Sequence, residues 1–323
     1  MKEESPPEGY TAAAPTLDDL GEIADLMAAA QRADLGTAET TAEALAGDLK
    51  GVDLATMAVL VRGDDGTAAA YADVIDRAHS VVSVYGHVHP AHRGRGLGRW
   101  LVKWGERYAE RVMPLADPEA MVAVQHFVPK EHAKARELLA GRGYEPVREV
   151  YEMAIDLREA PAVPDAPDGF SVRVFRPGID DRAAYEAMED AFRDLWGRPQ
   201  GSWERYRAML DVLAADPGLM LLAWDGDDLA GQCWARRLGD EAWIDALGVG
   251  RRWRGRGLGR FLLLSAFAAL RERGARTTML NVDAGNTSGA ARLYLGAGMR
   301  ILRGHDVMRR VLRPGGELVD ERA

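Results

Sequence analysis

The stretch RGRGLGRFLL, residues 254–263, joins an apolar segment to a stretch of helical periodicity through a loop of arginine and glycine. A second copy, RGRGLGRWLV, occupies residues 93–102. The hexamer RGRGLG is identical in both copies, which start 161 positions apart. A repeat of that length is too long for a solenoid and has the size of a domain. The sequence therefore predicts two tandem domains of one fold.

Shorter landmarks recur at nearly the same spacing. Gly9-Tyr10 corresponds to Gly169-Phe170, and the acidic pair Asp18-Asp19 corresponds to Asp180-Asp181. Between the halves lies REAPAVPDAPDG, residues 158–169, whose proline content is typical of an extended linker. We therefore predict an N-terminal domain over residues 1–160, a linker over 161–168 and a C-terminal domain over 169–323.

Each hexamer stands at the same place in a repeated order of elements. Before it lie two apolar runs joined by a Gly/Asp turn: TMAVLVRGDDGTAAAYADVI in the first half and LMLLAWDGDDLAGQCWARR in the second. After it come an amphipathic helix, a short apolar strand and another helix. Each half reads β-α-α-β-β-β-α-β-α-β-β. This order predicts an α+β protein of two domains, each a mixed, mostly antiparallel sheet flanked by helices.

Composition excludes several classes of protein. The chain has 323 residues and a net charge of −9, so it has no overall basic footprint for nucleic acid. The N-terminus MKEESPPEGY lacks the apolar core of a secretory signal, and no apolar run reaches the ~18 residues of a membrane span. The sole cysteine, Cys233, cannot form an internal disulfide, which favours a reducing cytoplasm. The histidines show no metal-ligand spacing. We expect a cytoplasmic protein that binds no metal, nucleic acid or membrane.

The Arg/Gly loop has the features of an anion site. A helix N-terminus carries unpaired N–H groups and a partial positive charge. Glycines let a ligand approach the backbone, and arginines add paired donors for phosphate oxygens. The dinucleotide fingerprint fails, because its third glycine is replaced by Arg99 in the first half and Arg260 in the second. A nucleotide-triphosphate loop ending in G-K-S/T is also absent. The pattern favours a different diphosphate ligand, although a strand-to-helix turn with solvated arginines would look the same.

The pattern Arg-x-x-Gly-x-Gly resembles the acyl-CoA pyrophosphate loop of the GNAT superfamily of N-acetyltransferases. It is formed by Arg254, Gly257 and Gly259 in the second half and by Arg93, Gly96 and Gly98 in the first. The later segment NVDAGNTSGAARLYLGAGM is similar to the second motif of that family, with Asn286, Leu293-Tyr294 and Gly298-Met299. As a tandem pair, the chain resembles the mycothiol-synthase-like group of double GNAT proteins.

The resemblance implies where acetyl-CoA binds as acyl donor. In the second half the implied residues are Leu247, Val249, Arg254, Gly255, Arg256, Gly257, Leu258, Gly259, Arg260 and Asn286. In the first half they are Val88, Arg93, Gly94, Arg95, Gly96 and Gly98.

The resemblance also implies the catalytic groups. Tyr294 occupies the position of the tyrosine that protonates the departing CoA thiolate, and the matching residue of the first half is Leu139. Asp245 lies on the strand before the loop and by parity shares a face with Leu247 and Val249. It is our candidate for taking or holding the amine proton, and Val84 is its counterpart. The alternative without a catalytic role is a packed side chain for Tyr294 and a solvent-facing carboxylate at the edge of the sheet for Asp245. The first half therefore lacks both the tyrosine and the aspartate, so we expect a catalytic C-terminal domain and a degenerate N-terminal one.

The sequence therefore predicts an acetyl-CoA-dependent N-acetyltransferase acting on the primary amine of a small molecule. A cysteinyl amino-sugar thiol precursor, an antibiotic, an amino acid and a polyamine are all open acceptors. A protein or peptide N-acetyltransferase and a non-catalytic acyl-CoA sensor or scaffold are the alternatives. A monomer and a homodimer are equally compatible with the sequence.

Other residues have plainer interpretations. Cys233 is expected to pack in a strand, and His126 and His132 are expected at the surface. Trp196 and Trp203 are expected in the core, although they lie where GNAT folds often wall the acceptor pocket.

Overall fold

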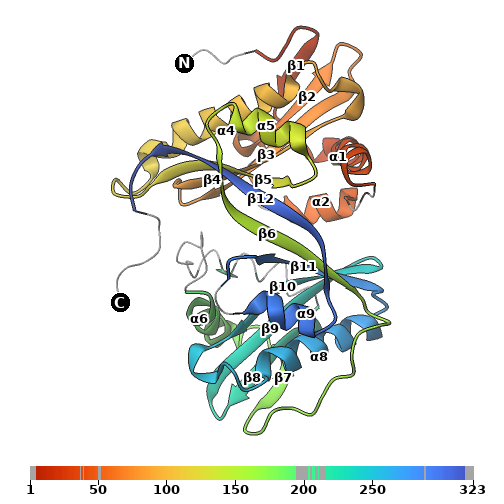
Figure 1. The fold of residues 1–323 in the computed structure, drawn as a ribbon, viewed down its shortest axis with the longest axis vertical. Coiled ribbons are helices and arrows are strands. Elements are labelled where there is room, and N and C mark those ends of the chain that lie inside the picture. The colour runs from red at the N-terminus through yellow and green to blue at the C-terminus, as the bar shows by residue number, and fades with distance from the viewer. Residues whose placement is uncertain are drawn as a thin grey trace. The chain divides into compact units, whose positions relative to one another are not determined.

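A computed structural model describes residues 5–36, 38, 40–49, 52–193, 203, 206–207, 210, 216–286 and 289–316. The described residues divide into two compact units (Figure 1). Unit 1 takes its residues from 1–148 and 305–317, and unit 2 takes its residues from 149–304.

Unit 1 is built around a mixed sheet of order β1-β2-β3-β4-β5-β12. Its elements are β1 (Tyr10–Ala13), α1 (Leu20–Leu35), α2 (Ala42–Asp48), α3 (Leu54–Met57), β2 (Ala58–Gly63), β3 (Ala68–Arg77), β4 (Val81–Val88), α4 (Leu97–Val112), β5 (Val122–Pro129), α5 (Ala133–Ala140) and the later part of β12 (Arg300–Arg313). Of these strand pairs, β4 and β5 run parallel and the others antiparallel.

Unit 2 repeats the plan, with the order β6-β11-β10-β9-β8-β7. Its elements are the later part of β6 (Glu145–Asp156), β7 (Ser171–Val174), α6 (Asp181–Phe192), β8 (Met220–Asp225), β9 (Asp228–Leu238), β10 (Glu241–Val249), α8 (Leu258–Glu272), β11 (Thr277–Asp283) and α9 (Ala290–Gly296). Here β10 and β11 are the parallel pair. The predicted fold class is confirmed in both halves.

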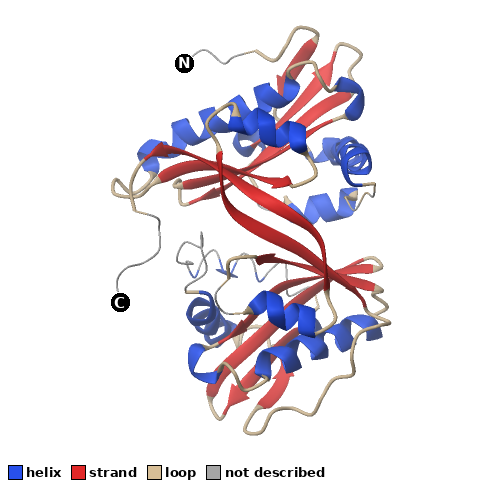
Figure 2. Ribbon diagram, in the orientation of Figure 1, coloured by secondary structure: helices blue, strands red, loops and turns tan. Residues whose placement is uncertain are grey.

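Helices cover both faces of each sheet (Figure 2). On β9, Cys233 packs in the core under α8, whereas the next residue, Trp234, packs in the core under α6. Successive side chains of a strand point to opposite faces, so this alternation places α8 and α6 on opposite sides of the sheet. Cys233 is fully buried, which confirms its predicted packing role.

The last element of each half differs from the prediction. Two short final strands were expected, but the structure has one long strand in each half, β6 and β12. Residues 149–156 of β6 belong to unit 2, where they pair with β11. Residues 305–313 of β12 belong to unit 1, where they pair with β5 (Figure 1). The halves thus exchange their terminal strands, and the compact units do not follow the linear boundaries at 160 and 169.

The core of unit 1 contains a buried polar cluster. Glu106 of α4 is 5% exposed and accepts a hydrogen bond from Arg142 Nε at 3.2 Å. His126 of β5 is 8% exposed and packs edge-on against Tyr144, with ring centroids 5.2 Å apart. The predicted surface position of His126 is therefore wrong, because β5 lies between two other strands of the sheet and this side chain points under α4.

Burial makes His126 a source of acid sensitivity. Desolvation lowers its pKa from 6.5 to about 4. The unfolded chain therefore binds a proton that the folded chain resists, so stability is full above pH 6.5 and falls as the pH drops toward 4. The expected loss is on the order of 3 kcal/mol at ~1.4 kcal/mol per pKa unit. His126→Leu should flatten this decline in urea unfolding at pH 7, 5.5 and 4.5. An unchanged slope, or equal flattening by His132→Leu, would contradict the assignment.

Candidate active site

The second Arg/Gly loop is a glycine-shaped turn between β10 and α8. It follows a short 3-10 turn, Arg251–Trp253, and ends at Gly257, the residue that caps α8. Gly255 and Gly257 have φ of 75° and 82°. Side chains rarely adopt this left-handed backbone, so glycine is strongly favoured at both positions. The turn lies on the surface, with its main chain open to a ligand.

The backbone of this turn presents hydrogen-bond donors. The N–H of Phe261 bonds to the Gly257 carbonyl at 3.1 Å, closing the first turn of α8. The N–H groups of Leu258, Gly259 and Arg260 precede that bond and have no acceptor within the helix. They point along the positive end of the helix dipole, which suits a phosphate group.

The loop arginines hold the turn in place. Arg254 donates from Nε to the Val249 carbonyl at 3.1 Å and from Nη2 to the Ala191 carbonyl at 3.0 Å. Arg260 donates to the Gly296 carbonyl at the end of α9. These side chains fix the turn between β10, α6 and α9. The N–H groups at the start of α8 lie within the turn that these side chains fix.

Arg256 lies against the segment that precedes β7. Its guanidinium is 4.3 Å from the centre of the Phe170 ring and donates to the Asp168 carbonyl at 3.3 Å. A Cβ on Gly257 would lie 3.9 Å from Pro167. Residues 167–170 thus flank the loop, which explains why Gly169-Phe170 recurs in the sequence.

Unit 1 contains the same turn with different partners. Gly94 and Gly96 have φ of 79° and 88°, and Gly96 caps α4. Arg93 donates to the Val88 carbonyl at 3.4 Å and forms two hydrogen bonds to Asp34, at 2.7 and 2.8 Å. Arg95 reaches the Tyr10 hydroxyl at 3.3 Å. Gly98 follows in the first turn of α4. The anchoring arginine and the flanking aromatic residue are therefore repeated.

The parallel strands open just before each loop. The pairing of β10 with β11 covers Glu241–Trp243 and Thr277–Met279, although the strands continue to Val249 and Asp283. The pairing of β4 with β5 likewise covers Val81–Ser83, although β4 runs to Val88. Leu247, Val249 and Val88 lie beyond the paired stretch. Main-chain groups along this opening can bond an extended amide-containing chain, so the opening and the loop together fit a CoA-shaped molecule.

The comparisons agree with this geometry. The model of the "Acetyltransferase (GNAT) family" matches residues 24–125 and 183–299. The chain belongs to the GNAT acetyltransferase family. A mycothiol acetyltransferase of Thermobispora bispora is 31% identical over 284 residues, covering 82% of this chain and 90% of that protein. One of Catenulispora acidiphila is 35% identical over 167 residues, covering 49% of this chain and 52% of that protein.

A solved structure is similar along the whole chain. The GCN5-related N-acetyltransferase from Sphaerobacter thermophilus has a TM-score of 0.86 and 42% sequence identity, and the match covers 98% of this chain and 99% of that one. The protein is therefore an acyltransferase of two GNAT units whose acyl donor is acetyl-CoA.

The two GNAT units differ at the strand before the loop. The pairing of β10 with β9 is interrupted by a bulge between Ile244 and Ala246, which leaves Asp245 as the extra residue. The pairing of β4 with β3 continues from Val81 to Val88 without a register shift. A bulge re-aims side chains and often lies next to an active site.

The bulge corrects the predicted direction of Asp245. Ile244 and Leu247 both pack in the core under α8, so the alternation shifts between them. Asp245 bonds to Arg236 Nε at 2.9 Å, and Arg236 alternates on β9 with residues of the α8 face. Asp245 therefore lies on the α6 face and does not share the face of Leu247 and Val249.

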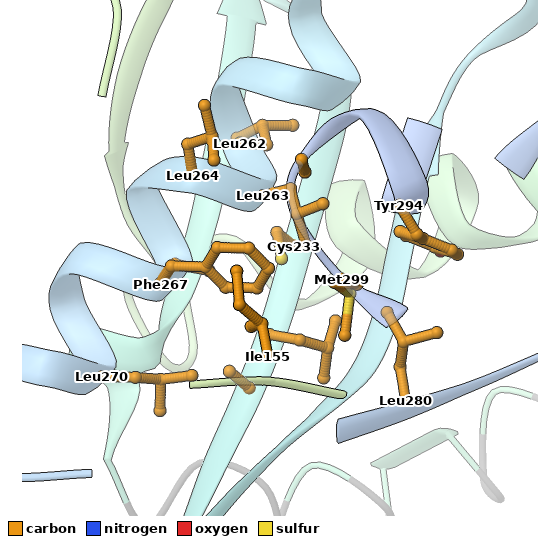
Figure 3. Packing of buried hydrophobic residues seen from close by; sticks show 14 of the residues in the cluster. Ile155, Cys233, Leu262, Leu263, Leu264, Phe267, Leu270, Leu280, Tyr294 and Met299 are labelled. Atoms are coloured by element: carbon orange, nitrogen blue, oxygen red, sulfur yellow. The ribbon is translucent and has the colours of Figure 1, made fainter. Parts of the chain in front are cut away.

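Tyr294 lies at the edge of the α8 core. It is on α9, is 8% exposed and belongs to the same cluster as Cys233. Figure 3 shows it on the side of this cluster opposite Leu270. Burial, with a smaller contribution from the Cys233 thiol, raises the pKa of Tyr294 well above its ordinary value. The hydroxyl therefore keeps its proton at neutral pH. Leu139, the residue at this position in unit 1, is buried in an apolar core.

Four further residues of the second half bear on the sequence-based predictions. Asn286 lies in the turn after β11, where its N–H bonds to the Asp283 carbonyl at 3.1 Å. Trp196 lies outside the described residues. Trp203 stacks on Tyr206 with ring centroids 5.8 Å apart, in the core cluster under α6. Arg236 was missed, because a single arginine on a strand carries no signal without its partner.

Among the described residues, no helix combines the length and the apolar character needed to cross a membrane. Over the same part of the chain, no three or more His, Cys, Asp or Glu side chains are grouped so that they could hold a metal ion.

Proposed function

We propose that this protein is an N-acetyltransferase for the primary amine of a small molecule and that unit 2 carries the chemistry. One observation supports this assignment above others. Both units have the Arg/Gly turn and the opened strand pair, but unit 2 adds the bulge with Asp245 on one side and Tyr294 on the other. Unit 1 has a regular strand at Val84 and an apolar Leu139 in their places.

Acetyl-CoA supplies an acetyl thioester that the acceptor amine attacks directly. The N–H groups at the start of α8 and the main chain of Leu247 and Val249 hold the donor in line with the opening between β10 and β11. Arg254, Gly255, Arg256, Gly257, Leu258, Gly259, Arg260 and Asn286 form the rest of this binding set.

Asp245 and Tyr294 act from opposite faces of the sheet. Asp245, on the α6 face, takes the proton that the amine loses as the N–C bond forms, and Arg236 fixes the direction of its carboxylate. Tyr294, on the α8 side, donates its proton to the sulfur as the C–S bond breaks, so that CoA leaves as the thiol. Its raised pKa keeps the proton on the phenol until that charge appears.

The acceptor is proposed from the relatives. Two proteins that match this chain are named mycothiol acetyltransferases, which favours a small cysteinyl amino-sugar amine over a protein or peptide. For unit 1 we propose weak acyl-CoA binding or a supporting role, through Val88, Arg93, Gly94, Arg95, Gly96 and Gly98.

The test is the release of free CoA thiol from acetyl-CoA in the presence of a panel of amines. The panel contains cysteinyl amino sugars, amino acids, aminoglycosides, polyamines and a lysine peptide. We expect a cysteinyl amino sugar to stimulate release by at least 100-fold over buffer. Acetyl-CoA binding with no stimulation by any amine would instead support a sensor, and stimulation only by the peptide would support a protein acetyltransferase.

A further inference from the structure

The exchanged strands carry different side chains at matching positions. On β12, Arg309 lies opposite Gln125 and Arg310 lies opposite Val124 of β5. On β6, Ala154 lies opposite Met279 and Ile155 lies opposite Thr278 of β11. The parallel pairs align Ser83–Gln125 with Trp243–Met279, so these positions correspond in the two units.

In each unit, the helix packed on the exchanged strand carries a side chain that complements that strand: a carboxylate on α4 for β12, and an apolar ring on α8 for β6. Arg310 Nη1 bonds to Oε1 of Glu106 on α4 at 2.9 Å, and Arg142 bonds to the same carboxylate. Counted from the identical hexamers, Glu106 corresponds to Phe267 of α8, which is fully buried. Phe267 and Ile155 belong to one apolar cluster (Figure 3). An ion pair between the buried Glu106 and the partly exposed Arg310 in unit 1 thus replaces an apolar contact in unit 2.

The opposite face of the sheet shows the same contrast. Arg309 is 5% exposed and donates from Nη2 to Oε1 of Gln125 at 2.9 Å, and Gln125 donates to the Ser83 hydroxyl at 2.9 Å. These three side chains form a buried polar row across β4, β5 and β12. The matching residues in unit 2 are Trp243, Met279 and Ala154.

A third pair of matching positions shows the same contrast between a charged residue on β12 and an apolar environment on β6. Asp306 lies opposite Val128 on β12, is 7% exposed and forms an ion pair with Arg136 Nε of α5 at 3.1 Å. The matching residue of β6 is Tyr151, which packs against the apolar core of unit 2.

Without exchange, each strand would meet the wrong partners. Ile155 would replace Arg310 beside Glu106 and leave that buried carboxylate with fewer donors. In unit 2, Arg309 would lie against Met279 and Arg310 against Phe267, and neither of these side chains is a carboxylate that could pair with an arginine. An unpaired buried charge costs far more than a lost apolar contact, so the mismatch is strongly unfavourable in both units.

We propose that Glu106 and Gln125 select the C-terminal strand of this chain as the last strand of unit 1. The edge of β5 is a docking surface that fits a strand with the Asp306, Arg309 and Arg310 pattern and rejects the apolar pattern of β6. Unit 1 is therefore completed by the last segment of the chain. Its fold depends on residues that follow the catalytic unit in the sequence.

The first experiment reads out strand choice in the full chain. Ala123 of β5 lies opposite Val311 of β12, and the residue of β6 at the same position is Asp156. Ala123→Cys with Val311→Cys forms a disulfide when β12 docks, because directly opposite residues have Cα atoms within reach of one. Ala123→Cys with Asp156→Cys forms one when β6 docks. Peptide mapping under non-reducing conditions measures both yields, and Cys233 is buried.

With the native residues we expect at least tenfold more of the first disulfide than of the second. Exchanging the pattern by Ala154→Arg, Ile155→Arg, Arg309→Ala and Arg310→Ile should shift this ratio toward the second by at least tenfold. A ratio that stays the same after the exchange overturns the proposal.

A second experiment covers the case in which that variant does not fold. Arg310→Met in the full chain should speed hydrogen exchange of the β5 amides by at least tenfold and leave the β11 amides unchanged. The matched control is Arg300→Met, an exposed position on the same strand that belongs to unit 2. Unchanged β5 exchange, or equal acceleration of β5 and β11, would show that the polar pattern does not hold the strand in unit 1.

Discussion

Replacing Tyr294 by phenylalanine should lower kcat for acetyl transfer by about 100-fold, in the range expected for loss of a general acid. The Kd for acetyl-CoA should change by less than about threefold, because the phenol acts on charge that develops only as the C–S bond breaks. Phenylalanine keeps the ring that fills the edge of the α8 core. Steady-state kinetics and titration calorimetry on the same preparation measure both quantities.

The pH profile separates this role from a packing role. Because burial raises the pKa of Tyr294, the phenol remains protonated beyond pH 10 and the native enzyme should show no alkaline loss of kcat from this group below that pH. The matched control is Tyr151→Phe, a tyrosine of β6 that packs on the same core. An equal loss in both variants, or native turnover in Tyr294→Phe across the pH range, would exclude the proton-donor role.

The repeated parts of the fold were predictable because their signals are local. The two hexamers, the strand-turn-strand segments before them and the helices after them follow from glycine, turn residues and apolar periodicity. The family came from a separate signal, the resemblance of the Arg-x-x-Gly-x-Gly loop and the later segment NVDAGNTSGAARLYLGAGM to two GNAT motifs, and that resemblance is why the loop glycines and Tyr294 could be named from the sequence.

The exchange of β6 and β12 was not predictable, because the side-chain pattern of a strand does not by itself show which of the two sheets will accept it. Which sheet accepts it depends on partners far away in the sequence, such as Glu106 for Arg310. The bulge at Asp245 was also not predictable from the sequence. A parity argument assumes a regular strand, and one inserted residue turns the next side chain to the other face.

Gly257→Asp should weaken acetyl-CoA binding by at least 100-fold, which corresponds to ~2.7 kcal/mol. Two effects contribute. The residue has φ of 82°, where a side chain adds roughly 1–2 kcal/mol of backbone strain, and a small shift of the turn that relieves this strain would misalign its N–H groups. The carboxylate would also stand at the N-terminus of α8, where the N–H groups of Leu258 and Gly259 are proposed to receive a phosphate, and like charges repel there.

Gly257→Asn isolates the charge. Asparagine has nearly the shape of aspartate and is equally tolerated at positive φ, so it should weaken binding by less than about tenfold. The gap between the two variants should narrow as salt rises, since the repulsion is screened. Gly96→Asp places the same carboxylate at the start of α4, where φ is 88°, and should change kcat/KM by less than about threefold if unit 2 alone carries the chemistry. Equal affinities of Gly257→Asp and Gly257→Asn for acetyl-CoA would contradict the proposal that this loop binds a phosphate. Loss of turnover in a folded Gly96→Asp variant would move part of the chemistry to unit 1.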